Sequence, residues 1–164
     1  MNQDFLKEDN FDPSIDGYLV AARNGDLNTI KELRSKSSQS LDVPDAMDLA
    51  ASNGHLEVVK YLHENKQSCS KKAIDEAASS GHLDVIKFLH ENRTEGCTTQ
   101  AIVNAIEHQQ EETAKFLNEN FIECDEESVK KFGLAHNNIN AIRWFQSENE
   151  QPTPLTKQDL ETNQ

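Results

Sequence analysis

The chain has 164 residues, of which 35% are hydrophobic and 27% charged, and its 29 acidic and 16 basic residues give a formal net charge of −13. This length allows one ordinary domain or one short array of repeats, and the low apolar fraction favours a thin core shared along the chain over the thick core of an α/β enzyme. The acidity disfavours binding to nucleic acid or to anionic lipid and favours a basic partner.

The beginning of the chain has no basic patch followed by an apolar stretch, and no run of about 18 apolar residues occurs in the sequence. We therefore expect a cytoplasmic protein that is neither exported nor anchored in a membrane. Residues 1–13 are expected to form a flexible acidic segment.

The sequence after this segment repeats itself. A lysine or arginine recurs at spacings of 29, 27, 28 and 28, at Lys31, Lys60, Lys87, Lys115 and Arg143. Such a fixed period indicates a repeat architecture. The five copies cover approximately residues 14–40, 41–69, 70–97, 98–124 and 125–149.

Each copy has the pattern of two short helices. In the third copy, Ile74, Ala77 and Ala78 fall on one face of a first helix. Gly81 follows where a helix end needs left-handed backbone geometry. The second helix then carries an apolar arc, consisting of Leu83, Val85, Ile86, Phe88 and Leu89. Two helices joined in this way are expected to fold back as a hairpin.

A single hairpin buries only one face, so several must stack into a solenoid. The fifth copy is the least regular, because it lacks the alanine pair and has Gly133 inside its first helix. Beyond it, residues 150–164 lose the periodicity and contain Pro152 and Pro154, which predicts a disordered tail.

Two segments carry a resemblance to a known family. "AMDLAASNGHLEVVKYLHEN" and "AIDEAASSGHLDVIKFLHEN", which begin at Ala46 and Ala73, resemble the ankyrin repeat. The first copy keeps the alanine pair and Gly25, the fourth keeps Ala105, and the fifth keeps only its second helix. The resemblance implies an all-α, ankyrin-like helical-hairpin solenoid of about five repeats.

The copies depart from the ankyrin pattern in two ways. "DAMD" and "KAID" replace the Thr-Pro-Leu-His start, so we expect the hydroxyl and histidine that tie neighbouring repeats together to be missing. The period of 27 to 29 leaves too few residues for a β-hairpin finger, as in the fingerless variants of large protist ankyrin families. A tetratricopeptide array, with a period of about 34, fits worse.

Three cysteines, Cys69, Cys97 and Cys124, recur at the same place in successive linkers. Stacked helices lie roughly 8–10 Å apart, so equivalent residues are not expected to converge on a zinc ion or to form a disulfide. We expect small linker residues that stay reduced.

The repeated histidines also suggest metal or hydrolase chemistry, but the sequence shows no group that would converge on them. We expect His55 and His82 to bond the inter-helix turn, and His63 and His90 to lie near helix C-termini, where positive charge is favoured. Neither a metal nor a cofactor is expected.

Aromatic residues recur at one position of the second helix, at Tyr61, Phe88, Phe116 and Trp144. They could recognise a partner helix or stack on nucleobases, but packing between adjacent second helices is the favoured interpretation. The most acidic stretch runs from Glu107 to Glu127, with eight carboxylates and the single Lys115.

The resemblance to ankyrin repeats implies a non-catalytic protein-interaction module, present as a monomer, that holds a protein partner on its concave face. The positions that vary between copies there are Leu49, Ser52, Asn53, Glu76, Ser79, Ser80, Asn104, Glu107 and His108. Two alternatives stay open. One is an enzyme with a site between repeats or in an oligomer, and the other is a divergent fragment of a repeat family with no specific partner.

Overall fold

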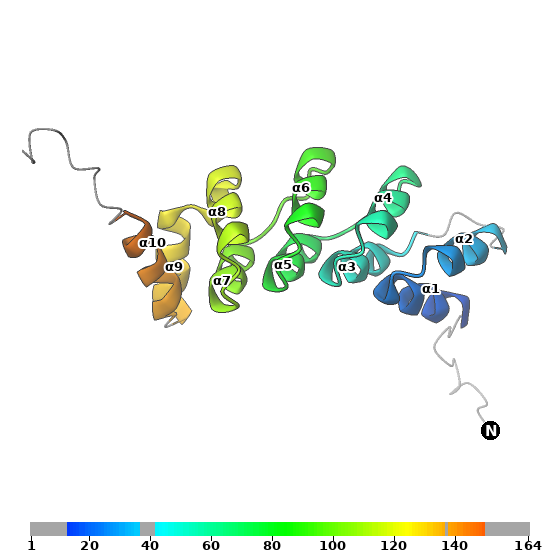
Figure 1. The fold of residues 1–164 in the computed structure, drawn as a ribbon, viewed down its shortest axis with the longest axis horizontal. Coiled ribbons are helices and arrows are strands. Elements are labelled where there is room, and N and C mark those ends of the chain that lie inside the picture. The colour runs from blue at the N-terminus through cyan, green and yellow to red at the C-terminus, as the bar shows by residue number, and fades with distance from the viewer. Residues whose placement is uncertain (1–12, 37–41, 137, 150–164) are drawn as a thin grey trace, which may run out of the picture.

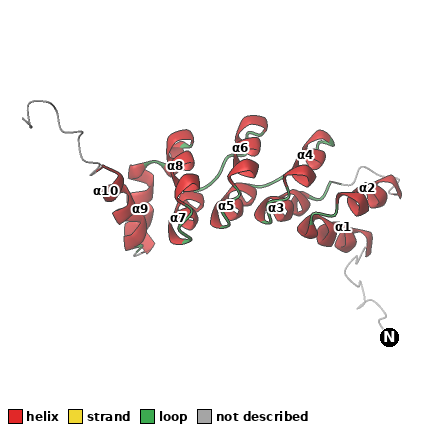
Figure 2. Ribbon diagram, in the orientation of Figure 1, coloured by secondary structure: helices red, strands yellow, loops and turns green. Residues whose placement is uncertain are grey.

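The computed structural model describes residues 13–36, 42–136 and 138–149, which form a stack of helical hairpins (Figure 1). The helices are α1 (Pro13–Asn24), α2 (Leu27–Lys36), α3 (Pro44–Ser52), α4 (Leu56–Glu64), α5 (Lys72–Ser79), α6 (Leu83–Asn92), α7 (Thr99–Glu107), α8 (Glu111–Asn120), the short 3-10 helix η1 (Ile122–Cys124), α9 (Glu126–His136) and α10 (Ile139–Asn149). The described residues contain no strand (Figure 2), so the all-α solenoid is confirmed. The expected N-terminal segment, apart from Pro13, and the expected tail lie outside the described residues.

A glycine makes the turn inside each of the first three hairpins. Gly25, Gly54 and Gly81 have φ angles of 73°, 73° and 72°, a left-handed geometry that glycine adopts at little cost. The residue after each glycine donates its N–H to the first helix, as His82 N does to Ala77 O at 3.0 Å. This bond satisfies a carbonyl at the helix end, and the predicted role of the glycine is confirmed.

The histidine after the glycine packs on the neighbouring repeat. A Cβ atom at Gly25 would lie 2.6 Å from His55 Nδ1, and one at Gly54 would lie 2.6 Å from His82 Nδ1. His55 Nε2 also lies 2.8 Å from Arg23 O. His55 thus makes a hydrogen bond near the inter-helix turn, but its partner Arg23 O lies in the last turn of α1, in the preceding hairpin.

The first helices stack more closely than the second helices. Helices α1, α3, α5 and α7 pack in one row, whereas α4, α6 and α8 stand as separate ribs along the opposite edge (Figure 1). Small side chains permit the close row, because Ala50, Ala51, Ala77 and Ala78 are fully buried. The stack therefore curves with its first helices on the inner side, which we call the inner face.

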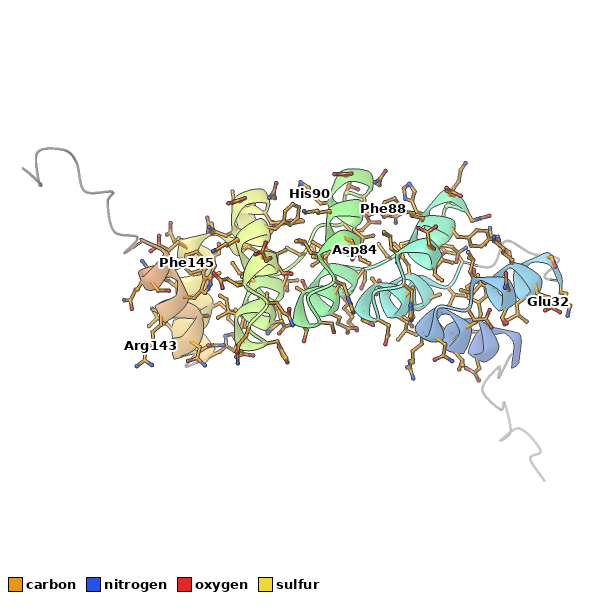
Figure 3. All side chains as sticks on the ribbon, in the orientation of Figure 1. Glu32, Asp84, Phe88, His90, Arg143 and Phe145 are labelled. Carbon is orange, nitrogen blue, oxygen red and sulfur yellow. The ribbon has the colours of Figure 1, made fainter. Side chains whose placement is uncertain are left out.

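Aromatic rings fill the wider gaps between the ribs. Phe88 meets His63 of α4 edge-on at 5.6 Å between ring centroids, and His90 meets Phe116 of α8 at 5.8 Å. Figure 3 shows Phe88 and His90 leaving α6 on opposite sides. The stripe is partly buried and packs against the core at all four positions, Tyr61, Phe88, Phe116 and Trp144. The prediction that this stripe packs between second helices is confirmed for Phe88 and Phe116, whereas Trp144 lies on α10, which packs on α9 and α7.

Two buried aspartates tie neighbouring repeats together. The Asp48 carboxylate accepts hydrogen bonds from Ser70 N at 2.9 Å and Ser70 Oγ at 2.5 Å. The Asp75 carboxylate accepts from Thr98 N at 2.8 Å and Thr98 Oγ1 at 2.7 Å. The histidine and hydroxyl of the Thr-Pro-Leu-His start are missing from "DAMD" and "KAID", as expected. A different tie is present, because the aspartate at the histidine position accepts from a hydroxyl of the next repeat.

The junction between the fourth and fifth repeats is built differently. Val103 occupies the position that Asp48 and Asp75 hold in the preceding repeats, and it is buried. Helix α10 packs against both α9 and α7 instead of standing out as a rib. A Cβ atom at Gly133 would lie 2.9 Å from Ile142 Cγ1, so the glycine inside α9 lets α10 cross closely.

Candidate protein-interaction surface

The nine predicted partner-binding residues lie toward the C-terminal ends of α3, α5 and α7, the first helices of three successive repeats. They form three rows, which we call the inner rows: Leu49, Glu76 and Asn104; Ser52, Ser79 and Glu107; Asn53, Ser80 and His108. Because α5 packs on both α3 and α7, the structure brings equivalent residues of neighbouring repeats side by side.

In α3, the polar side chains of the inner rows bond their own helix. Ser52 Oγ and Asn53 Nδ2 both donate to Leu49 O, at 3.0 and 2.8 Å. A carbonyl in the last turn of a helix lacks an intrahelical partner, and these side chains supply one. Some of the hydrogen-bonding capacity of Ser52 and Asn53 therefore satisfies the C-terminal end of α3.

Asn104 has a structural role that its variability does not suggest. Its Nδ2 donates to Asp75 O at 3.0 Å, and its Oδ1 accepts from Gln100 Nε2 at 2.7 Å. The first bond joins α7 to α5 and the second lies within α7. Both ends of the Asn104 amide are thus engaged inside the stack.

Glu107, the last residue of α7, and His108, which follows it, also link repeats. Glu107 Oε1 accepts from Asn138 Nδ2 at 2.6 Å, which connects α7 to the turn before α10. The Nδ1 atom of His108 lies 2.9 Å from Asn104 O and 3.4 Å from Ser79 Oγ. Glu107 and His108 are still exposed, so a partner could reach them at the expense of these bonds.

Glu76 and Ser80 are the most available members of the inner rows. Both are exposed. Within the part of the chain that the structure describes, neither side chain forms a hydrogen bond or an ion pair. Their polar atoms can therefore bind a partner without breaking a contact of the stack.

Val20 extends the first inner row by one repeat. It lies 29 residues before Leu49, as Gly25 lies 29 residues before Gly54, and 54% of its surface is exposed. The sequence interpretation missed Val20, although the glycine spacing alone assigns it to this row. An exposed valine beside the half-buried Leu49 gives this end of the inner face an apolar character.

Two family models, both described as ankyrin repeats, match the chain, one with three copies over residues 18–100 and one with many copies over residues 74–146. The chain belongs to the ankyrin repeat family. Stacked repeats of this type present extended concave surfaces for binding, which supports a protein-interaction module.

Among solved structures, the ankyrin array resembles a chain from the crystal structure of the yeast ribosomal protein Rps3 in complex with its chaperone Yar1. The TM-score is 0.56 at 22% sequence identity, over 66% of this chain and 93% of that one. At this identity the likeness shows the fold alone. No curated protein matches the sequence.

Two linker cysteines of the ankyrin array approach each other. Cys97 Sγ and Cys124 Sγ are 3.5 Å apart and both residues are buried. The expectation that equivalent cysteines cannot converge is wrong, because linker residues are not held at the spacing of the helix axes. Both thiols are free. The hydrogen bond with Cys124, together with burial, raises the pKa of Cys97, and burial raises the pKa of Cys69 to about 11.

The repeated histidines are spread over the array. In residues 13–36, 42–136 and 138–149, no three His, Cys, Asp or Glu side chains group as a metal site would require. Over the same residues, no helix combines the length and apolar character needed to cross a membrane.

An open pocket of about 400 Å³ lies between the fourth and fifth repeats. The C-terminal half of α7, the following turn, the first half of α8 and one face of α10 supply its walls. The lining residues are Ala105, Ile106, Gln109, Gln110, Glu111, Ala114, Trp144 and Ser147. This pocket is separate from Glu76 and Ser80, the available members of the inner rows.

Proposed function

We propose that this ankyrin array is a non-catalytic, monomeric protein-interaction module that binds a protein partner through its inner face. The observation that carries the proposal is the contrast between the positions that pack the stack and the variable positions beside them. Buried alanines and aspartates that pack the stack recur in successive repeats, while the exposed or half-buried positions beside them differ, as Leu49, Glu76 and Asn104 do. A rigid stack with changing exposed side chains suits recognition of one partner at several points.

The charge of the chain favours a basic partner. Of the carboxylates between residues 107 and 127, five lie at exposed positions: Glu107, Glu111, Glu112, Glu119 and Glu127. A surface of one sign attracts a partner of opposite sign and accelerates association, most strongly at low salt. The fold has a precedent for holding a protein, since the solved structure that it resembles contains a chaperone bound to a ribosomal protein.

The inner face is tested by charge reversal at its available residues. A Glu76→Arg, Ser80→Arg double variant should reduce partner capture from an extract of the native cell by about tenfold or more, because two cations would face a basic partner. Glu91→Arg on α6 is the control, since Glu91 is also exposed but lies on a second helix. Bound proteins would be quantified by mass spectrometry, with folding checked by circular dichroism.

Capture that survives the double variant, or that Glu91→Arg reduces to the same extent, would contradict binding through the inner face. Asn104 and Glu107 are unsuitable for this test. Their substitution would also remove the hydrogen bonds to Asp75 O and Asn138, so a loss of capture could reflect a disturbed stack.

A further inference from the structure

The pocket between the fourth and fifth repeats carries a charged residue where the first three repeats carry leucine and the fifth carries isoleucine. The second helices of the first three repeats begin at Leu27, Leu56 and Leu83, and all three leucines are partly buried. Leu27 and Leu56 also pack against the core. The fourth repeat has Glu111 at this position, where it is exposed and lines the pocket. Repeat packing alone does not account for a carboxylate here.

The turn before Glu111, at Gln109, differs from the turns of the first three hairpins both in its central residue and in the side chain that follows from the next repeat. Gln109 has a φ of 58° where the earlier repeats have glycine. The rings of His55 and His82 lie against the turns of the preceding hairpins. The corresponding residue of the fifth repeat, Asn138, instead donates its side-chain amide to Glu107. The turn at Gln109 consequently borders an open pocket.

The pocket walls combine an aromatic ring with a negative charge. Trp144 is contributed by α10 and Glu111 by α8. Lys115 Nζ lies 2.8 Å from Glu111 Oε1, and this hydrogen bond lowers the pKa of Glu111, which keeps the carboxylate ionised at neutral pH. A carboxylate offers about four acceptor positions, so it can bond a second cation beside Lys115.

We propose that this pocket receives an arginine side chain of the protein partner, with the guanidinium stacked on Trp144 and bonded to Glu111. The inference rests on the proposed function, whose partner is basic, and adds a defined contact to it. A guanidinium is planar, stacks on indole and donates to carboxylates in a fixed geometry, which suits this pair of groups better than the compact ammonium of lysine.

Trp144 makes the proposal directly measurable, because it is the only tryptophan of the chain. The 164-residue chain would be titrated with acetyl-hexaarginine amide while the tryptophan emission is recorded. Hexacitrulline, which keeps the planar end groups but has no charge, is the control peptide. We expect a saturable change in emission with the arginine peptide and none with the citrulline peptide at the same concentrations.

Variants distinguish binding of the peptide in the pocket from its nonspecific electrostatic attraction to an acidic protein. Glu111→Gln should weaken hexaarginine binding about fivefold. Glu111→Leu, which introduces the residue of the first three repeats, should weaken it at least as much. Glu57→Gln is the matched control, because Glu57 pairs with Lys60 at 2.9 Å on α4 as Glu111 pairs with Lys115 on α8. This control should change binding less than twofold.

Equal losses for Glu111→Gln and Glu57→Gln would overturn the proposal, and so would saturation without a change in Trp144 emission or an equal response to hexacitrulline. The outcome is independent of the inner-face test. If Glu76→Arg, Ser80→Arg abolishes partner capture while hexaarginine leaves Trp144 unaffected, the proposed function stands and only the arginine contact fails.

Discussion

At the scale of single residues, the turn position shows how one φ angle governs a repeat. Glycine holds this position in the first three hairpins with φ near 73°, and Gln109 holds it in the fourth with φ of 58°. A residue with a Cβ atom is strained in this region by roughly 1–2 kcal/mol. The fourth hairpin therefore keeps the turn geometry of its neighbours without the residue that favours it.

Gln109→Gly should raise the free energy of unfolding by about 0.5 kcal/mol, because relief of the strain exceeds the entropy that glycine adds to the unfolded chain. Ser80→Gly is the control. Ser80 has a φ of −94°, so glycine there adds entropy without relieving strain and should lower stability by up to about 1 kcal/mol. Urea unfolding followed by circular dichroism measures the free energy of unfolding of both variants. A loss of stability in Gln109→Gly would show that the turn at Gln109 is not strained.

At the scale of helices and their linkers, the sequence predicted what depends on local patterns. Paired helices, glycine turns and an aromatic stripe follow from spacing within one repeat. The bonds from Asp48 to Ser70 and from Asp75 to Thr98 span 22 and 23 residues, and only the stacking geometry reveals them. The same limit applies to the candidate surface: variability identified its rows, but the structural role of Asn104 depends on its contact with another repeat.

The tie at Asp75 should contribute measurably to stability. Asp75→Ala leaves Thr98 N–H without its partner and should lower the free energy of unfolding by about 1–3 kcal/mol at pH 7. Burial raises the pKa of Asp75, against the lowering effect of the Thr98 hydrogen bonds. The folded state therefore binds the proton of Asp75 more tightly than the unfolded state does. The stability gained from this tighter proton binding is present at acid pH and is lost as the pH rises through the folded pKa.

The stability difference between the wild type and Asp75→Ala should consequently widen as the pH falls from 7 toward the unfolded pKa of about 3.9. Urea unfolding of both proteins across this range measures the difference. Val103→Ala, which removes apolar contacts at the equivalent position of the fourth repeat, is the control and should show no such widening. A difference that narrows on acidification would mean that the Thr98 bonds outweigh burial.

At the scale of the whole molecule, the array is uneven along its length. Aspartate ties join the second repeat to the third and the third to the fourth. In the fourth repeat Val103 replaces the aspartate, so the fourth and fifth repeats are joined instead by the hydrogen bond from Asn138 to Glu107 and border an open pocket. In a linear stack, stability is approximately the sum of each repeat and its neighbour contacts. Local opening should therefore begin at the C-terminal end.

Hydrogen exchange of the 164-residue chain tests this difference in stability along the array. Amides of α9 and α10 should exchange about tenfold or more faster than those of α3, α5 and α7, because fewer interactions must break to release the last hairpin. Mass spectrometry with peptide-level resolution distinguishes these segments. Equal protection from α3 to α10 would contradict the gradient and show that the repeats open as one unit. Slower exchange of α9 and α10 in the presence of hexaarginine would in addition place the peptide at the last junction, where the pocket lies.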